Sequence, residues 1–160
     1  MKTRLLILNH SVLFLCASMY LGTGWSLILF SFPVASELTP STYYMQFVPQ
    51  VEAATRFFTW MTILMIGLCI VMIISEWKRR SRWLPVVVLA AVVAATWLTK
   101  QYIFPLNEQM KAGITDQATL NDILAQWMKT NWIRTLLWTV QWLAMMTYFA
   151  LEARRARQAP

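Results

Sequence analysis

Polar side chains interrupt an apolar run near the end of the sequence, in the segment WMKTNWIRTLLW. At about 100° per residue, a helix through this segment carries on one face Trp127, Asn131, Arg134, Trp138 and Gln141. Polar groups that face lipid cost a few kcal/mol each, so this face should point toward other helices. An inward amide and guanidinium can donate hydrogen bonds to an anion, or to an oxygen that becomes negative during a reaction. Asn131 and Arg134 are therefore the candidate catalytic residues.

Other cationic, polar and aromatic side chains should lie at the same depth, near the outer surface of the membrane. They are Arg56, Trp60, Trp97, Lys100, Asn107 and Trp127. Aromatic walls with a few polar groups are typical of small-molecule pockets, and cations favour an anionic ligand. We therefore predict that these residues bind a hydrophobic or anionic amphiphilic small molecule. In the alternative interpretation, Asn131 and Gln141 join helices by hydrogen bonds and Arg134 extends to the lipid headgroups.

Composition indicates the elements that must position these residues. The chain has 160 residues, of which 58% are hydrophobic and 13% are charged, and its mean hydropathy is +0.49. A soluble domain has about 25% charged residues, which keep it in water. The low fraction of charged residues indicates an integral membrane protein, so the lipid bilayer is an expected partner.

Four apolar blocks are long enough to span a membrane, which takes about 20 residues of helix. They cover approximately residues 5–32, 54–74, 83–104 and 132–151. Lipid offers no hydrogen-bond partner to a bare backbone, so each block should be a helix. We predict an all-α fold, namely a four-transmembrane-helix bundle that forms a single membrane domain over residues 1–160.

The two outer connections carry further signals. Pro33 to Gln50 should lie at the membrane interface, and Glu52 and Arg56, one turn apart, should form an ion pair. The other connection should begin at Pro105 and contain an amphipathic helix capped by Thr115 before the last span. Apolar residues recur there at helical spacing, at Leu120, Ile123, Leu124 and Trp127.

Basic residues predict the orientation in the membrane. They cluster before the first block, in the second connection and after the last block, at Lys2, Arg4, Lys78, Arg79, Arg80, Arg82, Arg154, Arg155 and Arg157. Cytoplasmic loops are enriched in Lys and Arg, so both termini should be cytoplasmic, with a bacterial inner membrane as the expected location. This clustering accounts for most of the net charge of +7 and argues against nucleic acid as a partner. The apolar run of the first block continues past small residues that resemble a signal cleavage site, so we interpret it as a retained anchor.

Few metal ligands fall inside the predicted spans. The single histidine, His10, should lie level with Met145 and Tyr148, where a structural hydrogen bond is its expected role. Cys16 and Cys69 lack a C-x-x-C spacing, so we interpret them as small buried hydrophobic residues. We therefore predict no metal site and no bound cofactor, and a single histidine excludes a bis-histidine haem.

Small residues in the first block should allow another helix to approach closely. Ser18, Gly22 and Ser26 recur every four residues, and Gly24 lies beside them. The neighbour is expected to be a helix of the same bundle. A homo-oligomer is the alternative.

Three short motifs resemble those of a known family. They are LGTGWSLILFSFPVAS at the end of the first block, PLNEQM after the third block and W-x3-N-x2-R at the start of the fourth. In these motifs, and in their order along most of the chain, the sequence is similar to the DUF1772 membrane proteins, also called the anthrone oxygenase-like family. The matching positions are Pro105, Asn107, Trp127, Asn131 and Arg134.

The resemblance implies a four-helix membrane protein. A few characterised members oxidise anthrones and related polycyclic phenols to quinones with molecular oxygen, whereas most members have no assigned reaction. An oxygenase of this kind needs no metal if its site removes a proton and stabilises the resulting anion, here with Arg134 and Asn131. The sequence places no base beside them.

Two functions are therefore expected from the sequence. One is a cofactor-independent oxygenase that acts on an apolar aromatic substrate, of a phenolic or polyketide type, in an outer-leaflet pocket. The other is a non-enzymatic membrane protein that binds lipid or quinone, or that is a small subunit of a larger membrane complex.

Overall fold

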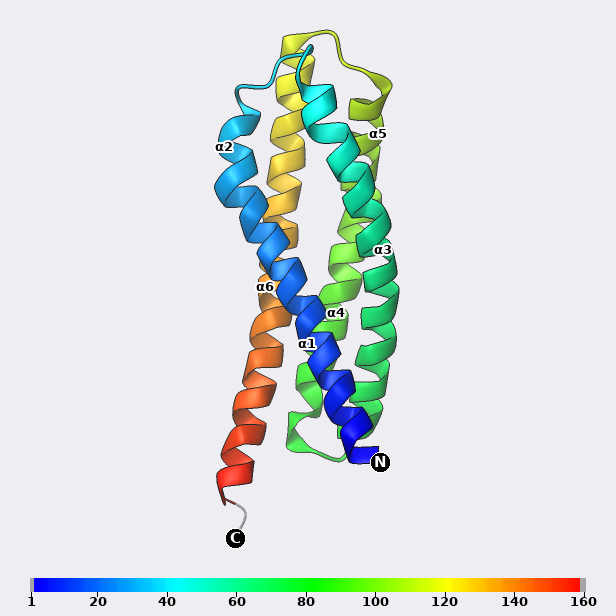
Figure 1. Cartoon of the computed structure of the whole chain (residues 1–160), viewed down its shortest axis with the longest axis vertical. Helices are drawn as coiled ribbons and strands as arrows, with labels where there is room; N and C mark the ends of the chain where they lie inside the picture. Colours follow the sequence, from blue (N-terminus) through cyan, green and yellow to red (C-terminus); the bar gives the residue numbers. More distant parts are fainter. Residues whose placement is uncertain (1, 159–160) are drawn as a thin grey trace.

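The computed structural model describes residues 2–158, which form helices and short connections without a strand. In chain order the elements are α1 (Lys2–Ser26), the π-helical turn η1 (Leu27–Ser31), α2 (Phe32–Ala35), α3 (Tyr43–Glu76), the 3-10 turn η2 (Arg80–Arg82), α4 (Trp83–Leu98), the π-helical turn η3 (Thr99–Ile103), α5 (Phe104–Ala112) and α6 (Gln117–Gln158). The long helices α1, α3, α4 and α6 run along the long axis of the molecule (Figure 1). The predicted all-α class is confirmed.

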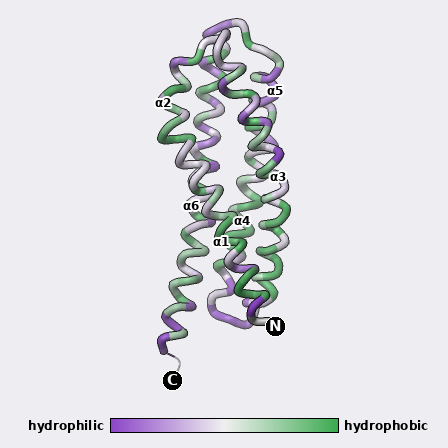
Figure 2. Tube along the Cα trace, viewed as in Figure 1, coloured by the Kyte–Doolittle hydropathy of each residue, from purple (hydrophilic) through white to green (hydrophobic). Residues whose placement is uncertain are grey.

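Three helical stretches are long and apolar enough to cross a membrane, as judged by length and composition. They are Arg4–Ala35, Tyr43–Glu76 and Arg80–Ala112. Figure 2 shows hydrophilic residues gathered at both ends of the molecule. The first three apolar blocks of the sequence lie inside these stretches, and the chain is a membrane-embedded helical protein.

Helix α3 begins at Tyr43, earlier than the expected start of the second span near residue 54. Pro49 therefore lies inside a helix. The interpretation of Pro33 to Gln50 as one connection is wrong at its start, where residues 33–35 belong to α2, and again from Tyr43 onward. A proline cannot donate to the carbonyl four residues earlier, which here belongs to Met45. Met45 is exposed near the end of the molecule, where solvent or headgroups can replace that donor.

Tyr43 anchors this end of α3 to the connection between α5 and α6. Its buried hydroxyl donates a hydrogen bond to the carbonyl of Met110 at 2.9 Å and accepts one from the Ile114 N–H at 2.6 Å. These bonds satisfy two backbone groups where α5 ends. The packing of Tyr43 thus favours a helix that starts here.

The third stretch stays helical beyond Pro105, through α5 to Ala112. The π-helical turn η3 ends two residues before this proline, which lies in the first turn of α5, where a helix tolerates a missing N–H. The helix ends at Gly113, whose φ of 94° is accessible to a residue without a Cβ. The connection is therefore confined to residues 113–116, and the prediction that it begins at Pro105 is wrong.

Helix α6 runs from Gln117 to Gln158, so the predicted amphipathic segment and the fourth apolar block are one helix. Its cap is Asp116 rather than Thr115. The Oδ2 atom of Asp116 accepts hydrogen bonds from the backbone N–H and the hydroxyl of Thr119, both at 2.8 Å. The carboxylate reaches the third amide of the helix, which is the usual geometry of an N-cap. The apolar residues expected on one face are buried, namely Leu120, Ile123, Leu124 and Trp127.

The Asp116 cap should make the start of α6 sensitive to acid. The hydrogen bonds from Thr119 hold the pKa of the Asp116 carboxyl below its ordinary value. The stabilisation is therefore present above the unfolded-state pKa, about 3.9, and is lost as the pH falls through the folded-state pKa. We expect Asp116→Asn, which keeps a cap, to show a smaller loss of thermal stability between pH 7 and pH 3 than the parent. An equal loss in both proteins would contradict this role.

Two clusters of buried apolar residues hold the helices together. One joins the long helices at the end that holds both termini, and includes Leu13, Met65, Val88, Trp138 and Met145. The other lies at the opposite end, and includes Tyr43, Ile103, Met110, Leu120 and Trp127. The segment of α6 that carries Asn131 and Arg134 lies between these clusters, because Trp127 belongs to one and Trp138 to the other.

Candidate functional site

Asn131 is buried in the interior of the bundle. Its side chain is 0% exposed, and its Nδ2 donates a hydrogen bond to the Trp127 carbonyl at 2.8 Å. Its Oδ1 accepts a hydrogen bond from Nη2 of Arg134. These two bonds fix the amide orientation, and the predicted inward direction of Asn131 is confirmed.

Arg134 also points into the bundle. Its Nη1 lies 3.5 Å from the Thr99 hydroxyl on η3, and its Cζ lies 4.5 Å from the centroid of a Trp138 ring. The second distance is typical of a cation–π contact. Its Nε is buried and has no hydrogen-bond partner within the described part of the chain. Arg134 is thus a cation among apolar helices with part of its hydrogen-bonding capacity unused.

The charge of Arg134 has no counter-ion among the described side chains. The ion pairs of residues 4–158 involve other cations, namely Arg79, Lys111 and Arg155. A charge inside a membrane protein is costly unless it is paired, and it is typical of a functional site. The environment of Arg134 therefore favours a negatively charged or electron-rich oxygen as a ligand.

Aromatic rings from α1 and α3 pack against Trp138, the ring that contacts the guanidinium. Tyr20 packs against Trp138 with ring centroids 4.8 Å apart, and Phe58 lies 6.5 Å from the same indole. The Tyr20 hydroxyl is 2.5 Å from the Thr62 hydroxyl. Our sequence interpretation did not include Tyr20 or Thr99 in the site. Both residues carry a hydroxyl inside an apolar block, and this polar group could have identified them as candidates for the site.

Asn107 and Trp127 extend this polar arrangement toward α5. The indole Nε1 of Trp127 donates a hydrogen bond to Oδ1 of Asn107 at 3.1 Å. The Trp127 carbonyl accepts from Asn131, as described above. Predicted site residues are therefore connected in the order Asn107, Trp127, Asn131 and Arg134.

A groove of about 400 Å³ lies between α3 and α5, away from the termini. Its apolar lining comes from Phe47, Val48, Val51, Phe104 and Met110. Charged residues line the same groove, at Glu52, Arg56, Glu108 and Lys111. Of the predicted ligand-binding residues, Arg56 and Asn107 are in this lining, whereas Asn131 and Arg134 are not. The groove and the Arg134 cluster are thus separate places.

Three predicted ligand-binding residues lie on the outer surface. Trp60 is 74% exposed, Trp97 is 56% exposed, and Lys100 is exposed as well. The structure does not bring them together with Asn131 and Arg134. Of the three tryptophans expected as possible walls of the pocket, Trp127 alone is buried next to Asn131. Their positions on α3, α4 and η3 direct these side chains away from the bundle interior and toward the surface that would contact lipid.

Glu52 pairs with Lys111 rather than with Arg56. The distance from Glu52 Oε1 to Lys111 Nζ is 2.7 Å, and this contact joins α3 to α5. The expected ion pair one turn along α3 is therefore wrong. Lys111 belongs to α5, which continues past Pro105 and brings this residue beside Glu52. From the sequence, Lys111 was expected in the connection that begins at Pro105.

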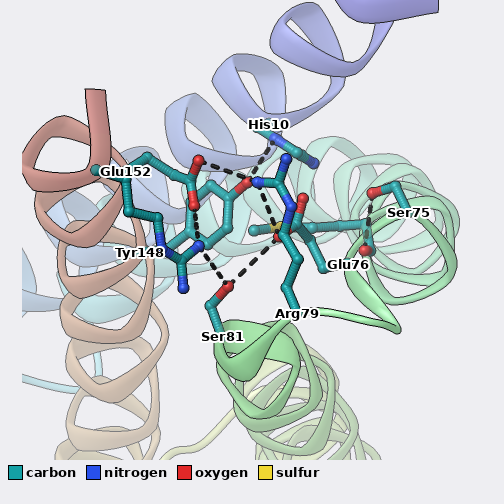
Figure 3. Close-up of polar contacts among 9 residues, drawn as sticks. His10, Ser75, Glu76, Arg79, Ser81, Tyr148 and Glu152 are labelled. Carbon is teal, nitrogen blue, oxygen red and sulfur yellow. Dashed lines mark hydrogen bonds and ion pairs between the residues drawn. The ribbon is translucent and has the colours of Figure 1, made fainter. Parts of the chain in front are cut away.

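His10 lies at the other end of the bundle, where it faces Tyr148. Its Nδ1 is 3.3 Å from the Tyr148 hydroxyl, so the predicted structural hydrogen bond is confirmed. Figure 3 shows this pair next to the carboxylates of Glu76 and Glu152 and the guanidinium of Arg79. Within residues 4–158, no group of three or more His, Cys, Asp or Glu side chains is placed to hold a metal ion. The absence of a metal or cofactor remains a prediction.

The fold and the Arg134 cluster define a class of protein, namely a membrane-embedded helical protein with an inward-pointing, partly buried cation. No protein-family model matches the chain, and no curated protein or solved structure is significantly similar to it. The proposed function therefore depends on the geometry of the site and on the resemblance of its motifs.

Proposed function

We propose that the chain is an integral membrane protein of a bacterial inner membrane with four spans, the fourth being α6 from about residue 132 to 151. The outward face of α6 supports this span, because it exposes large apolar side chains at Trp132, Ile133, Leu136, Val140, Leu143 and Met146. The buried polar residues Asn131, Thr135 and Gln141 make the helix less apolar overall, yet they stay out of lipid.

Both termini are proposed to be cytoplasmic. The start of α1, the η2 turn and the end of α6 lie at one end of the molecule, the lower end of Figure 1. These segments carry the clusters of Lys and Arg. Their common location supports the orientation, because cytoplasmic segments are enriched in these residues.

The orientation predicts which positions a membrane-impermeant maleimide can label. In a background with Cys16→Ala and Cys69→Ala, we expect Thr115→Cys to be labelled in intact cells. Arg80→Cys should be labelled only after the membrane is permeabilised. Labelling of position 80 in intact cells would overturn the proposed orientation.

The function that the site supports best is binding of an apolar small molecule with an anionic or electron-rich oxygen. The observation that carries this proposal is the partly buried, inward-pointing guanidinium of Arg134, which has no ion pair among the described side chains and a buried Nε without a partner there. Asn131 holds the guanidinium in one position. Trp138 and Tyr20 supply aromatic surface for an aromatic or quinone-like ligand.

A cofactor-independent oxygenase is the second candidate, favoured by the paired donors of Asn131 and Arg134 and by the motif resemblance. In that reaction the methylene carbon of an anthrone gains one oxygen atom of O2. Its two hydrogens leave with the other oxygen atom as water. The step requires a base, and the hydrogen-bond partners of Arg134 in the described chain, Asn131 and Thr99, are not bases. Binding is therefore the primary proposal, and a small subunit of a membrane complex remains compatible with it.

Purified protein in detergent can test both functions with anthrone as the probe, since its enolate carries an electron-rich oxygen. Quenching of tryptophan fluorescence reports binding, and an oxygen electrode reports turnover. Binding without anthrone-dependent oxygen uptake supports the binding function. Oxygen uptake that requires Arg134 supports the oxygenase. If neither anthrone nor oleate, a carboxylate amphiphile, bound the protein, the proposed function would be wrong.

A further inference from the structure

A second groove, of about 580 Å³, opens at the end of the molecule that holds the termini. Its lining consists of Arg79, Arg80, Glu152, Arg155 and Ala156. Arg79 and Arg80 follow the end of α3, whereas Arg155 belongs to the last turns of α6. Three guanidinium groups from two segments far apart in sequence thus line one groove.

Acidic side chains hold two of these arginines in place. Glu152 lies 3.0 Å from Nη1 of Arg79 and 2.5 Å from Nη1 of Arg155. Glu76, which is only 3% exposed, lies 3.5 Å from the same nitrogen of Arg79. Figure 3 shows Glu76, Arg79 and Glu152 converging between the end of α3 and α6. The arginines are therefore preorganised before any ligand arrives.

The two held arginines keep donors for a further partner. A guanidinium carries five N–H donors in a planar fork, and the ion pairs use Nη1 of Arg79 and Nη1 of Arg155. The Glu76 carboxylate raises the pKa of Arg79 above its ordinary value. Arg79 therefore stays cationic at any physiological pH.

The charge balance of the groove is positive. Glu76 and Glu152 offset Arg79 and Arg155, while Arg80 takes part in no ion pair of the described side chains. Residues 76–82 and 148–158 contain no acid other than Glu76 and Glu152. They add further cations at Lys78, Arg82, Arg154 and Arg157. An anion in the groove would thus meet a net attractive field.

The side chains next to the groove favour a location in the layer of lipid headgroups. Trp77 and Trp83 flank the η2 turn and are 59% and 54% exposed. Exposed tryptophans at the ends of membrane helices favour the headgroup layer. The abundant anions at that depth are the phosphate groups of lipids, which basic sites at helix ends recognise.

We propose that the groove lined by Arg79, Arg80 and Arg155 binds a phosphate group, carried by the headgroup of an anionic lipid. Guanidinium forks match the oxygen geometry of phosphate and can bind two oxygens at once. A zwitterionic choline headgroup adds a cation beside the arginines, so it binds more weakly than a headgroup with net negative charge. This site is independent of the ligand proposed for Arg134.

Native mass spectrometry of the full chain in detergent tests the proposal, with phosphatidylglycerol and phosphatidylcholine added in equal amounts. We expect the parent to retain phosphatidylglycerol preferentially. The double variant Arg79→Gln, Arg155→Gln should lose that binding by roughly tenfold per arginine. The matched control is Arg154→Gln, Arg157→Gln, which removes two charges at the same end outside the groove lining, and it should retain the lipid.

A second variant keeps the test decisive if the double variant does not fold. Arg80→Gln removes a lining cation that makes no ion pair, so the contacts of Glu76 and Glu152 stay intact, and lipid retention should fall about tenfold. Equal loss in the Arg154 and Arg157 control would show general surface attraction and overturn the site. Displacement of the lipid by millimolar inorganic phosphate would assign the groove to free phosphate and overturn the lipid headgroup as its carrier.

Discussion

Arg134→Gln should weaken ligand binding by tenfold to hundredfold and leave the helices folded. The variant removes the only charge of the cluster around Trp138 in the described chain, while its amide can still bond to Asn131. A charge-assisted hydrogen bond to a buried anion contributes about 1.5–3 kcal/mol, which corresponds to a tenfold to hundredfold change in affinity. Arg134→Lys keeps the charge but loses the planar fork, so we expect it to bind more weakly than the parent and more strongly than Arg134→Gln.

The stability of a third variant separates a ligand site from a structural role. Arg134→Met removes a buried cation that lacks a counter-ion, and desolvation of such an ion costs several kcal/mol. The loss leaves Oδ1 of Asn131 without its donor, at a cost of about 1–3 kcal/mol. We expect the first effect to be larger, so Arg134→Met should unfold at the same temperature as the parent or higher, while it binds no anthrone.

The matched control for these variants is Arg56→Gln, which removes one positive charge from the groove between α3 and α5. Binding by Arg56→Gln should equal that of the parent if the ligand lies at Arg134. Thermal unfolding in detergent and fluorescence quenching provide the two measurements. Normal binding by a folded Arg134→Gln protein would show that the ligand lies elsewhere, and loss of binding in Arg56→Gln would place it in the groove.

The inward face of α6 was predictable because its polar residues are few and recur at helical spacing. Asn131, Arg134 and Gln141 stand out in an otherwise apolar block, and lipid excludes them from the outer face. The same reasoning placed His10 beside Tyr148, since both lie at a similar distance from the ends of their helices. Periodicity and depth sufficed for these residues.

The orientation of α3 and α4 was not predictable in the same way. The membrane-spanning parts of these helices around Trp60 and Trp97 carry few polar residues, so the sequence does not indicate which face packs inward. The sequence therefore did not indicate that Trp60 and Trp97 face outward, as they do in the structure. At the start of the π-helical turn η3, Thr99 points toward Arg134, whereas the next residue, Lys100, is exposed.

Helix boundaries deviated at three prolines. Pro33, Pro49 and Pro105 were interpreted as ends of helices, yet Pro49 lies near an exposed helix start, and Pro33 and Pro105 lie in the first turn of a helix that follows a π-helical turn. The ion pairs of Glu52 with Lys111 and of Arg79 with Glu152 join segments far apart in sequence. Such contacts depend on how the helices are arranged, so local spacing did not indicate them.

Gly24→Ala should destabilise the protein, whereas Gly22→Ala should not. A Cβ at Gly24 would lie 2.7 Å from Oγ1 of Thr135 and 2.8 Å from Cε3 of Trp138. Both neighbours are buried on α6, so they cannot move aside without disturbing other contacts. Overpacking of this kind costs about 1–3 kcal/mol. At Gly22 nothing lies within 4 Å of the added carbon, so alanine should stabilise α1 by about 0.5–1 kcal/mol.

The two alanine variants also test whether α1 supports the Arg134 site. Displacement of Trp138 by the new methyl group would move its ring away from the guanidinium, whose Cζ now lies 4.5 Å from the ring centroid. We therefore expect Gly24→Ala to weaken anthrone binding in addition to lowering the unfolding temperature, and Gly22→Ala to change neither for the worse. Equal unfolding temperatures for the two variants would show that α1 and α6 do not approach closely at Gly24, and the aromatic wall around Arg134 would then lack its support from α1.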